Sequence, residues 1–140
     1  MTPQVSRAIE QIARQYPNNT VLVGADQNGG ACVIVENVPL GAPFAQNETW
    51  IGFHITHCCP YADVYPHFAR HDLSKVDGSQ IGEGVSSNHV FPQPGVVTGN
   101  TIPSRPAVQI SRRSNKRDPS SAVETPLLKL LKVLQWLKSR

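Results

Sequence analysis

Cysteine and histidine side chains are concentrated in the stretch Trp50–Asp72, which holds four of the five histidines and two of the three cysteines. Two chemistries use such residues. An imidazole can lower the pKa of a neighbouring cysteine thiol and so favour the nucleophilic thiolate. Cysteine together with histidine also binds zinc. The residues concerned are His54, His57, Cys58, Cys59, His67 and His71. Their spacing is poor for zinc, because the chain has no C-x-x-C pair and no second compact ligand pair downstream.

The adjacent residues Cys58 and Cys59 are the candidate thiol nucleophiles, with His57 beside them. They follow a strand-like run, and adjacent residues of a strand point to opposite faces, so at most one thiol would be presented. Free cysteine is most often a small buried hydrophobic residue, and we expect that role for Cys32 in the apolar run ACVIV. An odd cysteine count and the lack of an apolar signal core predict a cytoplasmic protein without a disulfide framework.

Charge is distributed unevenly along the 140 residues. Residues 1–104 carry four basic and eight acidic side chains, a net charge of −4, whereas residues 105–140 carry nine basic and two acidic, a net charge of +7. Nucleic-acid binders interleave aromatic with basic residues, but residues 105–140 contain one aromatic residue, Trp136. We therefore expect no nucleic-acid partner; an acidic protein partner or a solvated basic face explains the charge equally well. No apolar run approaches the about 18–20 residues that span a membrane, so no membrane association is expected.

Local signals predict the elements that would position these residues. A threonine followed by proline begins a helix at Thr2-Pro3 and again at Thr125-Pro126. The predicted strands are Thr20–Val23, Ala31–Val35, Trp50–Thr56 and Ala107–Ser111. The first two are joined by a hairpin turn at Asp26–Gly30, and an antiparallel meander is the simplest arrangement of the first three. The turn-rich segment Pro60–Pro106 is predicted to be a long loop without a helix.

The predicted C-terminal helix is apolar on most sides, with Lys129, Lys132 and Lys138 as its polar stripe. Such a helix must bury two faces or bind a partner. The length of the chain suits one domain with a modest core. We therefore expect a single α+β domain that spans residues 1–140.

The order of a helix, an antiparallel meander, a long loop and a further helix resembles the ubiquitin-conjugating enzyme (UBC) fold. The stretch from Phe53 to Tyr65-Pro66 resembles the third strand of that family and the proline-rich turn after it. The distal part, from Ala107 to Leu137, resembles the active-site strand, linker and following helix of diverged bacterial members. Those members occur with bacterial ubiquitin-like proteins and activating enzymes. The resemblance implies a UBC-like fold whose active-site segment follows the last strand.

Two features of that family are missing. The chain has no His-Pro-Asn motif, and no cysteine lies beyond Cys59, so a standard thioester at the standard place is excluded. The resemblance instead places Ser111 and Ser114 in the active-site segment. A serine can accept an acyl group as an oxyester if a base and oxyanion donors lie within hydrogen-bond reach. We expect Ser111 to be the acceptor, with Ser114 as the second choice.

Polar side chains elsewhere in the sequence would supply the remaining groups of such a site. The candidate bases are His89 and His71, the candidate oxyanion donors are Asn115, Asn88 and backbone amides, and the candidate contacts to a ubiquitin-like protein or another acidic partner are Arg112 and Arg113. No metal or cofactor is expected at this site.

The resemblance therefore predicts a transferase of a bacterial ubiquitin-like conjugation pathway. It would accept the C-terminus of a ubiquitin-like protein from an adenylating activating enzyme and pass it to a lysine amine. Cys58 and Cys59 remain alternative nucleophiles. Two alternatives of other classes stay open: a catalytically inactive UBC-like scaffold that binds both partners, and a zinc-stabilised binding protein.

Overall fold

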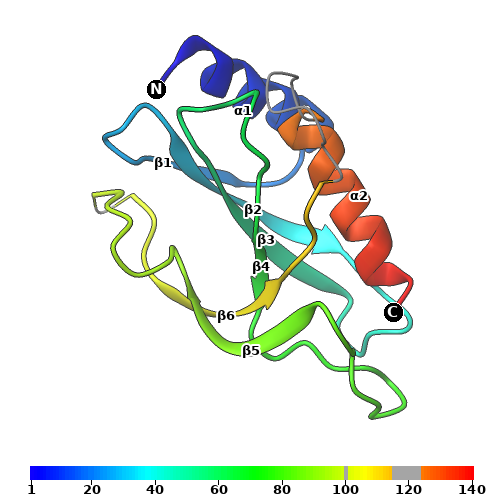
Figure 1. Ribbon diagram of the computed structural model, residues 1–140. Coiled ribbons are helices and arrows are strands. Elements are labelled where there is room, and N and C mark those ends of the chain that lie inside the picture. Colours follow the sequence, from blue (N-terminus) through cyan, green and yellow to red (C-terminus); the bar gives the residue numbers. More distant parts are fainter. Residues whose placement is uncertain (100, 115–123) are drawn as a thin grey trace.

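The two helices begin where the threonine-proline signals predict. The computed structural model describes residues 1–99, 101–114 and 124–140. Helix α1 spans Pro3–Gln15, and the Thr2 hydroxyl accepts a hydrogen bond from the Val5 amide at 3.2 Å. Helix α2 spans Pro126–Lys138 and is capped in the same way by Thr125, which accepts from the Leu128 amide at 3.1 Å. Both helices lie on one side of the sheet (Figure 1).

In the described ranges, six antiparallel strands form one sheet in the order β1-β2-β3-β4-β6-β5. Their bounds are β1 Val21–Ala25, β2 Ala31–Pro39, β3 Glu48–Ile55, β4 His67–Arg70, β5 Val85–Phe91 and β6 Arg105–Ile110. The predicted hairpin joins β1 and β2, and the first three strands pair in chain order as the meander predicted. The α+β class predicted from the sequence is therefore confirmed.

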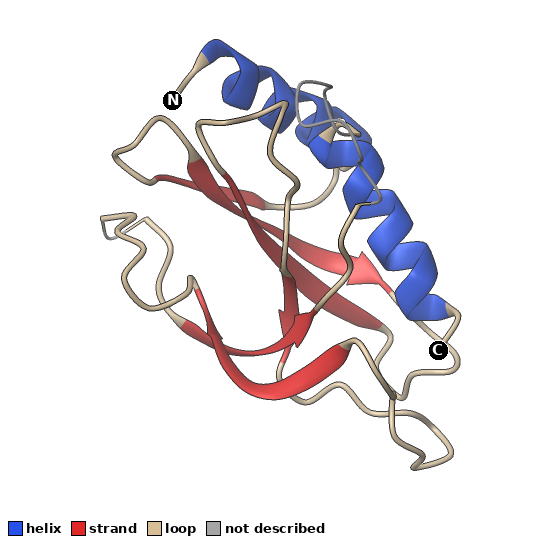
Figure 2. Cartoon of the chain, viewed as in Figure 1, coloured by secondary structure: helices blue, strands red, loops and turns tan. Residues whose placement is uncertain are grey.

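The segment Pro60–Pro106 is not the uninterrupted loop that the sequence suggested. It contains β4 and β5, and β6 lies between these two strands in the sheet. Figure 2 shows long loops before and after these strands, which agrees with the many turn residues in this segment. The absence of a helix between residues 60 and 99 agrees with the prediction for this described part.

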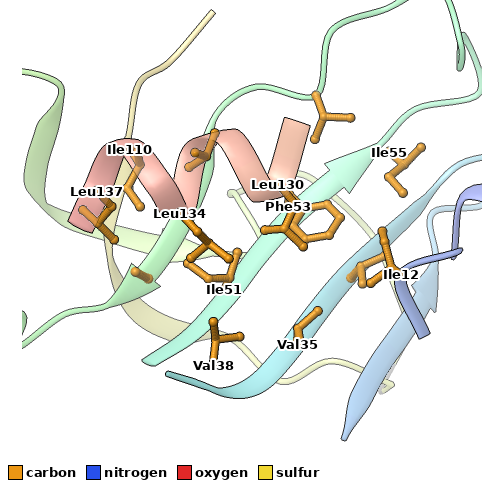
Figure 3. Packing of buried hydrophobic residues seen from close by; sticks show 14 of the residues in the cluster. Ile12, Val35, Val38, Ile51, Phe53, Ile55, Ile110, Leu130, Leu134 and Leu137 are labelled. Atoms are coloured by element: carbon orange, nitrogen blue, oxygen red, sulfur yellow. The ribbon is translucent and has the colours of Figure 1, made fainter. Parts of the chain in front are cut away.

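Each face of the sheet has its own hydrophobic core. The helix-face core joins both helices to the sheet, and Figure 3 shows ten of its side chains by name: Ile12, Val35, Val38, Ile51, Phe53, Ile55, Ile110, Leu130, Leu134 and Leu137. The far-face core, on the opposite side, consists of Cys32, Ile34, Phe68, Phe91, Ile102 and Ala107. Strand β2 contributes alternate residues to the two cores, as the period of two in a strand requires.

Helix α2 differs from its predicted pattern at one lysine. Lys129, expected in the polar stripe, is only 4% exposed. Leu128 and Leu131 are instead exposed, while Leu130 and Leu137 are fully buried. The helix therefore buries one wide face and carries a lysine within it, which requires a charged partner from elsewhere in the fold.

Candidate functional site

Ser111, the first-choice acceptor, is the residue that follows β6. Its amide donates to the Gly84 carbonyl at 2.7 Å, which ties the end of β6 to the start of β5. Its hydroxyl oxygen accepts a hydrogen bond from Gln109 Nε2 at 3.2 Å. The side chain is half-buried. Ser111 is thus held in place by backbone and side chain, and it lies on the same face of the sheet as Gln109.

His89, the predicted base, lies on β5 but contacts a different serine. Its Nε2 is 3.0 Å from Ser86 Oγ. Ser86 is directly opposite Gln109 in the β5–β6 register, and His89 is opposite Ala107. Cross-strand partners share a face of the sheet, so Ser86, His89 and Gln109 lie on one face together with Ser111. We call these four residues the hydroxyl cluster.

Sequence reasoning missed Ser86 for a physical reason. Residues three apart in a regular strand point to opposite faces, which would separate Ser86 from His89. The register between β5 and β6 shifts between these two residues, and Asn88 adopts a left-handed φ of 66°. A bulge of this kind adds one residue and restores a shared face. The sequence signal was only an asparagine, a residue that tolerates this conformation, inside a polar strand.

Ser114, the second-choice acceptor, belongs to a different polar network. Its amide and its hydroxyl each donate to the Asp63 carboxylate at 2.8 Å, and the hydroxyl is 3.2 Å from Glu124 Oε1. Lys129 Nζ donates to Asp63 at 2.8 Å and to Ser114 Oγ at 3.2 Å. This network connects the segment after β6 to the buried face of α2.

The Asp63 carboxylate is a weak base within this network. Burial by itself raises the pKa of Asp63, but the hydrogen bonds from Lys129 and Ser114 outweigh it and hold the pKa below its usual value. A carboxylate that is stabilised in this way removes a proton from a hydroxyl poorly. The contacts of Ser114 therefore favour a structural role over nucleophilic attack.

The arginines next to Ser111 stack on aromatic rings. The Arg112 guanidinium lies 4.8 Å from the centroid of the Trp136 ring, and Arg140 lies 4.5 Å from the same ring. Arg113 lies 4.0 Å from the centroid of the Tyr65 ring. Stacking holds a guanidinium in place while its donors can still reach a carboxylate or phosphate. Asn115, the predicted oxyanion donor, lies outside the described residues.

The two adjacent cysteines occupy a turn after β3. Cys58 is exposed, and its Sγ is 3.5 Å from His57 Nε2. Cys59 is half-buried, and burial raises the pKa of its thiol. Cys32 is buried in the far-face core as predicted, and burial together with the Asp26 charge raises its pKa to about 12. Only Cys58 therefore combines exposure with a neighbouring imidazole.

The candidate zinc ligands do not converge. No group of three or more histidine, cysteine, aspartate or glutamate side chains within the described ranges could hold a metal ion. His54 is instead paired with Asp26 at 2.6 Å. His67 is fully buried beside Phe53, with the two ring centroids 5.3 Å apart. Burial and the Lys129 charge lower the pKa of His67 to about 3, so this ring is neutral at pH 7.

Comparison with protein-family models, curated proteins and solved structures finds no match to this chain. Within the described residues, no helix has both the length and the apolar character needed to cross a membrane.

Proposed function

We propose that this chain is a diverged UBC-like protein that accepts the C-terminus of a ubiquitin-like protein on a serine hydroxyl and passes it to a lysine amine. Its donor would be the acyl adenylate made by an activating enzyme. The α+β class, with a helix before an antiparallel meander and another at the C-terminal end, is compatible with this proposal. The UBC-like arrangement itself is part of the proposal.

The observation that carries the proposal is the position of Ser111. It follows β6, where the resemblance places the active-site segment, and its backbone is fixed to Gly84. Arg112 extends from the next position onto Trp136, which Arg140 also contacts. Guanidinium groups bind carboxylates and phosphates through paired donors. These arginines would hold the acidic groups of an incoming acyl adenylate or of its protein.

The reaction is an acyl transfer. The Ser111 oxygen would attack the carbonyl carbon of the adenylate, the bond to the phosphate oxygen would break, and AMP would leave with the bonding electrons. The hydroxyl proton would pass to a base. A lysine amine of the target would then attack the ester and release Ser111. Each step needs the developing oxyanion to be stabilised by fixed donors.

A catalytically silent scaffold is the second candidate, and a specific observation favours it. Among the described residues, neither predicted acceptor has a histidine within hydrogen-bond distance. The Ser111 hydroxyl contacts Gln109, and the Ser114 hydroxyl contacts the Asp63 carboxylate. The predicted base His89 contacts Ser86 instead. In this role the arginines at the end of β6 would still bind the partners. No hydroxyl would become acylated.

An adduct assay separates these candidates. The purified protein is incubated with ATP, a bacterial ubiquitin-like protein and its adenylating enzyme, and the products are treated with dithiothreitol or hydroxylamine. We expect an adduct that resists dithiothreitol, is cleaved by hydroxylamine and is lost in Ser111→Ala. Ser79→Ala, an exposed serine on another loop, is the matched control and should retain it.

The other outcomes identify the alternatives. An adduct that is cleaved by dithiothreitol and lost in Cys58→Ser would identify Cys58, beside His57, as the acyl acceptor. Binding of both proteins without any adduct would support the scaffold. Zinc in the purified protein, measured by elemental analysis, would support the zinc-stabilised alternative.

A further inference from the structure

Ser86 and His89 form a contact of the kind that activates a hydroxyl. Ser86 Oγ and His89 Nε2 are 3.0 Å apart, within the distance at which an imidazole can take a hydroxyl proton. No other serine of the described residues has a histidine at hydrogen-bond distance. The pair depends on the β5 bulge, which brings the two residues onto one face.

The position of the pair makes it accessible. Strand β5 is at the edge of the sheet, and within the described part of the chain no strand pairs with its outer side. Ser86 is exposed, whereas His89 is half-buried and fixed on the strand. An acyl group in solution can therefore reach the Ser86 hydroxyl while His89 lies beside it.

Gln109 offers a donor for the oxyanion. It lies directly opposite Ser86 on β6. Its side-chain amide carries two hydrogens, and the contact with the Ser111 hydroxyl uses one of them. The other hydrogen remains available to a carbonyl oxygen that becomes an oxyanion when Ser86 attacks. Ser86, His89 and Gln109 thus supply a nucleophile, a base and a donor.

We propose that Ser86 is an acyl-accepting nucleophile, with His89 as its general base, and that it reacts with small activated esters such as aryl esters. The Ser86 oxygen attacks the carbonyl carbon, and its proton moves to His89 Nε2 in the tautomer that carries the ring hydrogen on Nδ1. The bond to the aryloxide leaving group then breaks, and His89 returns the proton to the aryloxide or to water. This goes beyond the proposed function, because it requires neither a ubiquitin-like protein nor an activating enzyme.

The test uses p-nitrophenyl acetate and the full chain. The protein is incubated with the ester, quenched at short times and digested, and acetyl groups are located and quantified by mass spectrometry. We expect Ser86 to be acetylated at least tenfold faster than the exposed Ser87 next to it. His89→Asn should slow acetylation of Ser86 at least tenfold, since general-base catalysis contributes about 10²–10⁴-fold.

Controls separate catalysis from folding. Ser87→Ala should leave acetylation of Ser86 unchanged, and circular dichroism should show that each variant is folded. Added imidazole should restore part of the rate in His89→Ala, which a merely structural role would not allow. Acetylation of Ser86 no faster than that of Ser87, or a rate that His89→Asn does not change, would overturn the proposal. Because no partner protein is present, this result stands apart from the adduct assay on Ser111.

Discussion

Lys129 is a charged side chain in the buried face of a helix, and one carboxylate compensates it. Lys129 is 4% exposed, and its Nζ lies 2.8 Å from Asp63. Removing one partner of a buried ion pair leaves the other uncompensated, so Lys129→Ala should lower the free energy of unfolding by about 3 kcal/mol. Urea denaturation measures this. Lys132→Ala, on the same helix and paired with Glu124 but 60% exposed, is the matched control.

The control and a double variant make this prediction specific. Lys132→Ala should change stability by about 0.5 kcal/mol or less, since exposed pairs contribute little. Asp63→Asn combined with Lys129→Met should recover part of the loss, because neither charge then remains buried. Equal losses from Lys129→Ala and Lys132→Ala would contradict the burial argument.

Asp26 joins the β1–β2 turn to β3, and the charge of its carboxylate should stabilise the folded state. Its carboxylate accepts from the amides of Asn28 and Gly30 and is paired with His54. Burial by itself raises the pKa of Asp26, but these hydrogen bonds outweigh it and hold the pKa below its usual value. A lowered folded-state pKa means that the stabilisation is present above the unfolded-state pKa of about 4 and is lost as the pH falls below it.

Asp26→Asn tests this dependence on pH. The stability of the wild type should exceed that of Asp26→Asn at pH 7, and the difference should shrink as the pH falls below about 4. Urea titrations at several pH values measure it. Glu10→Gln, an exposed position on α1, should show no comparable change. A difference that stays constant from pH 7 to pH 3 would mean that the Asp26 charge does not contribute.

The helices illustrate what a local signal can specify. Thr2 and Thr125 each accept a hydrogen bond from the amide three residues later. Thr2→Ala and Thr125→Ala should each lower the free energy of unfolding by about 1 kcal/mol, because an amide at the helix start loses its acceptor. The two losses should add, since the sites share no contact. Ser6→Ala, an exposed position inside α1, is the control and should not destabilise the protein.

Elements whose signals are local could be predicted from the sequence, and those that depend on distant partners could not. The helix caps and the β1–β2 turn depend on neighbouring residues. Strand β4 is four residues long and three of them are buried, so it has no alternation of polar and apolar residues. Strand β5 is mostly polar and bulged. Both strands pair with β6, and β4 also pairs with β3, so their places in the sheet depend on partners outside their own sequence.

The candidate site follows the same rule. The sequence predicts Ser111 at the end of a strand, and in the structure it is the residue directly after β6. The contact between Ser86 and His89 depends on a bulge, and the burial of Lys129 depends on Asp63, which is 66 residues away along the chain. Neither could be predicted from spacing along an ideal strand or helix.

The two cores of the molecule share the strands between them, so we expect them to unfold together. Strand β2 directs Val33 to the helix-face core and Ile34 to the far-face core. Loss of either core would expose apolar side chains of the same strands. The two tryptophans report on the two cores separately, because Trp50 packs against the far-face core and Trp136 against the helix-face core.

Single-tryptophan variants test this coupling. Trp136→Phe leaves Trp50 as the only fluorescent tryptophan, and Trp50→Phe leaves Trp136. In each variant, the urea unfolding transition measured by fluorescence should coincide with the transition measured by far-ultraviolet circular dichroism, as two-state unfolding requires. Adding Ile102→Ala, a change in the far-face core, should lower stability by about 2–4 kcal/mol. It should shift both fluorescence transitions equally, although Ile102 packs only in the far-face core. A shift confined to Trp50 would show that the far-face core unfolds separately from the helix-face core.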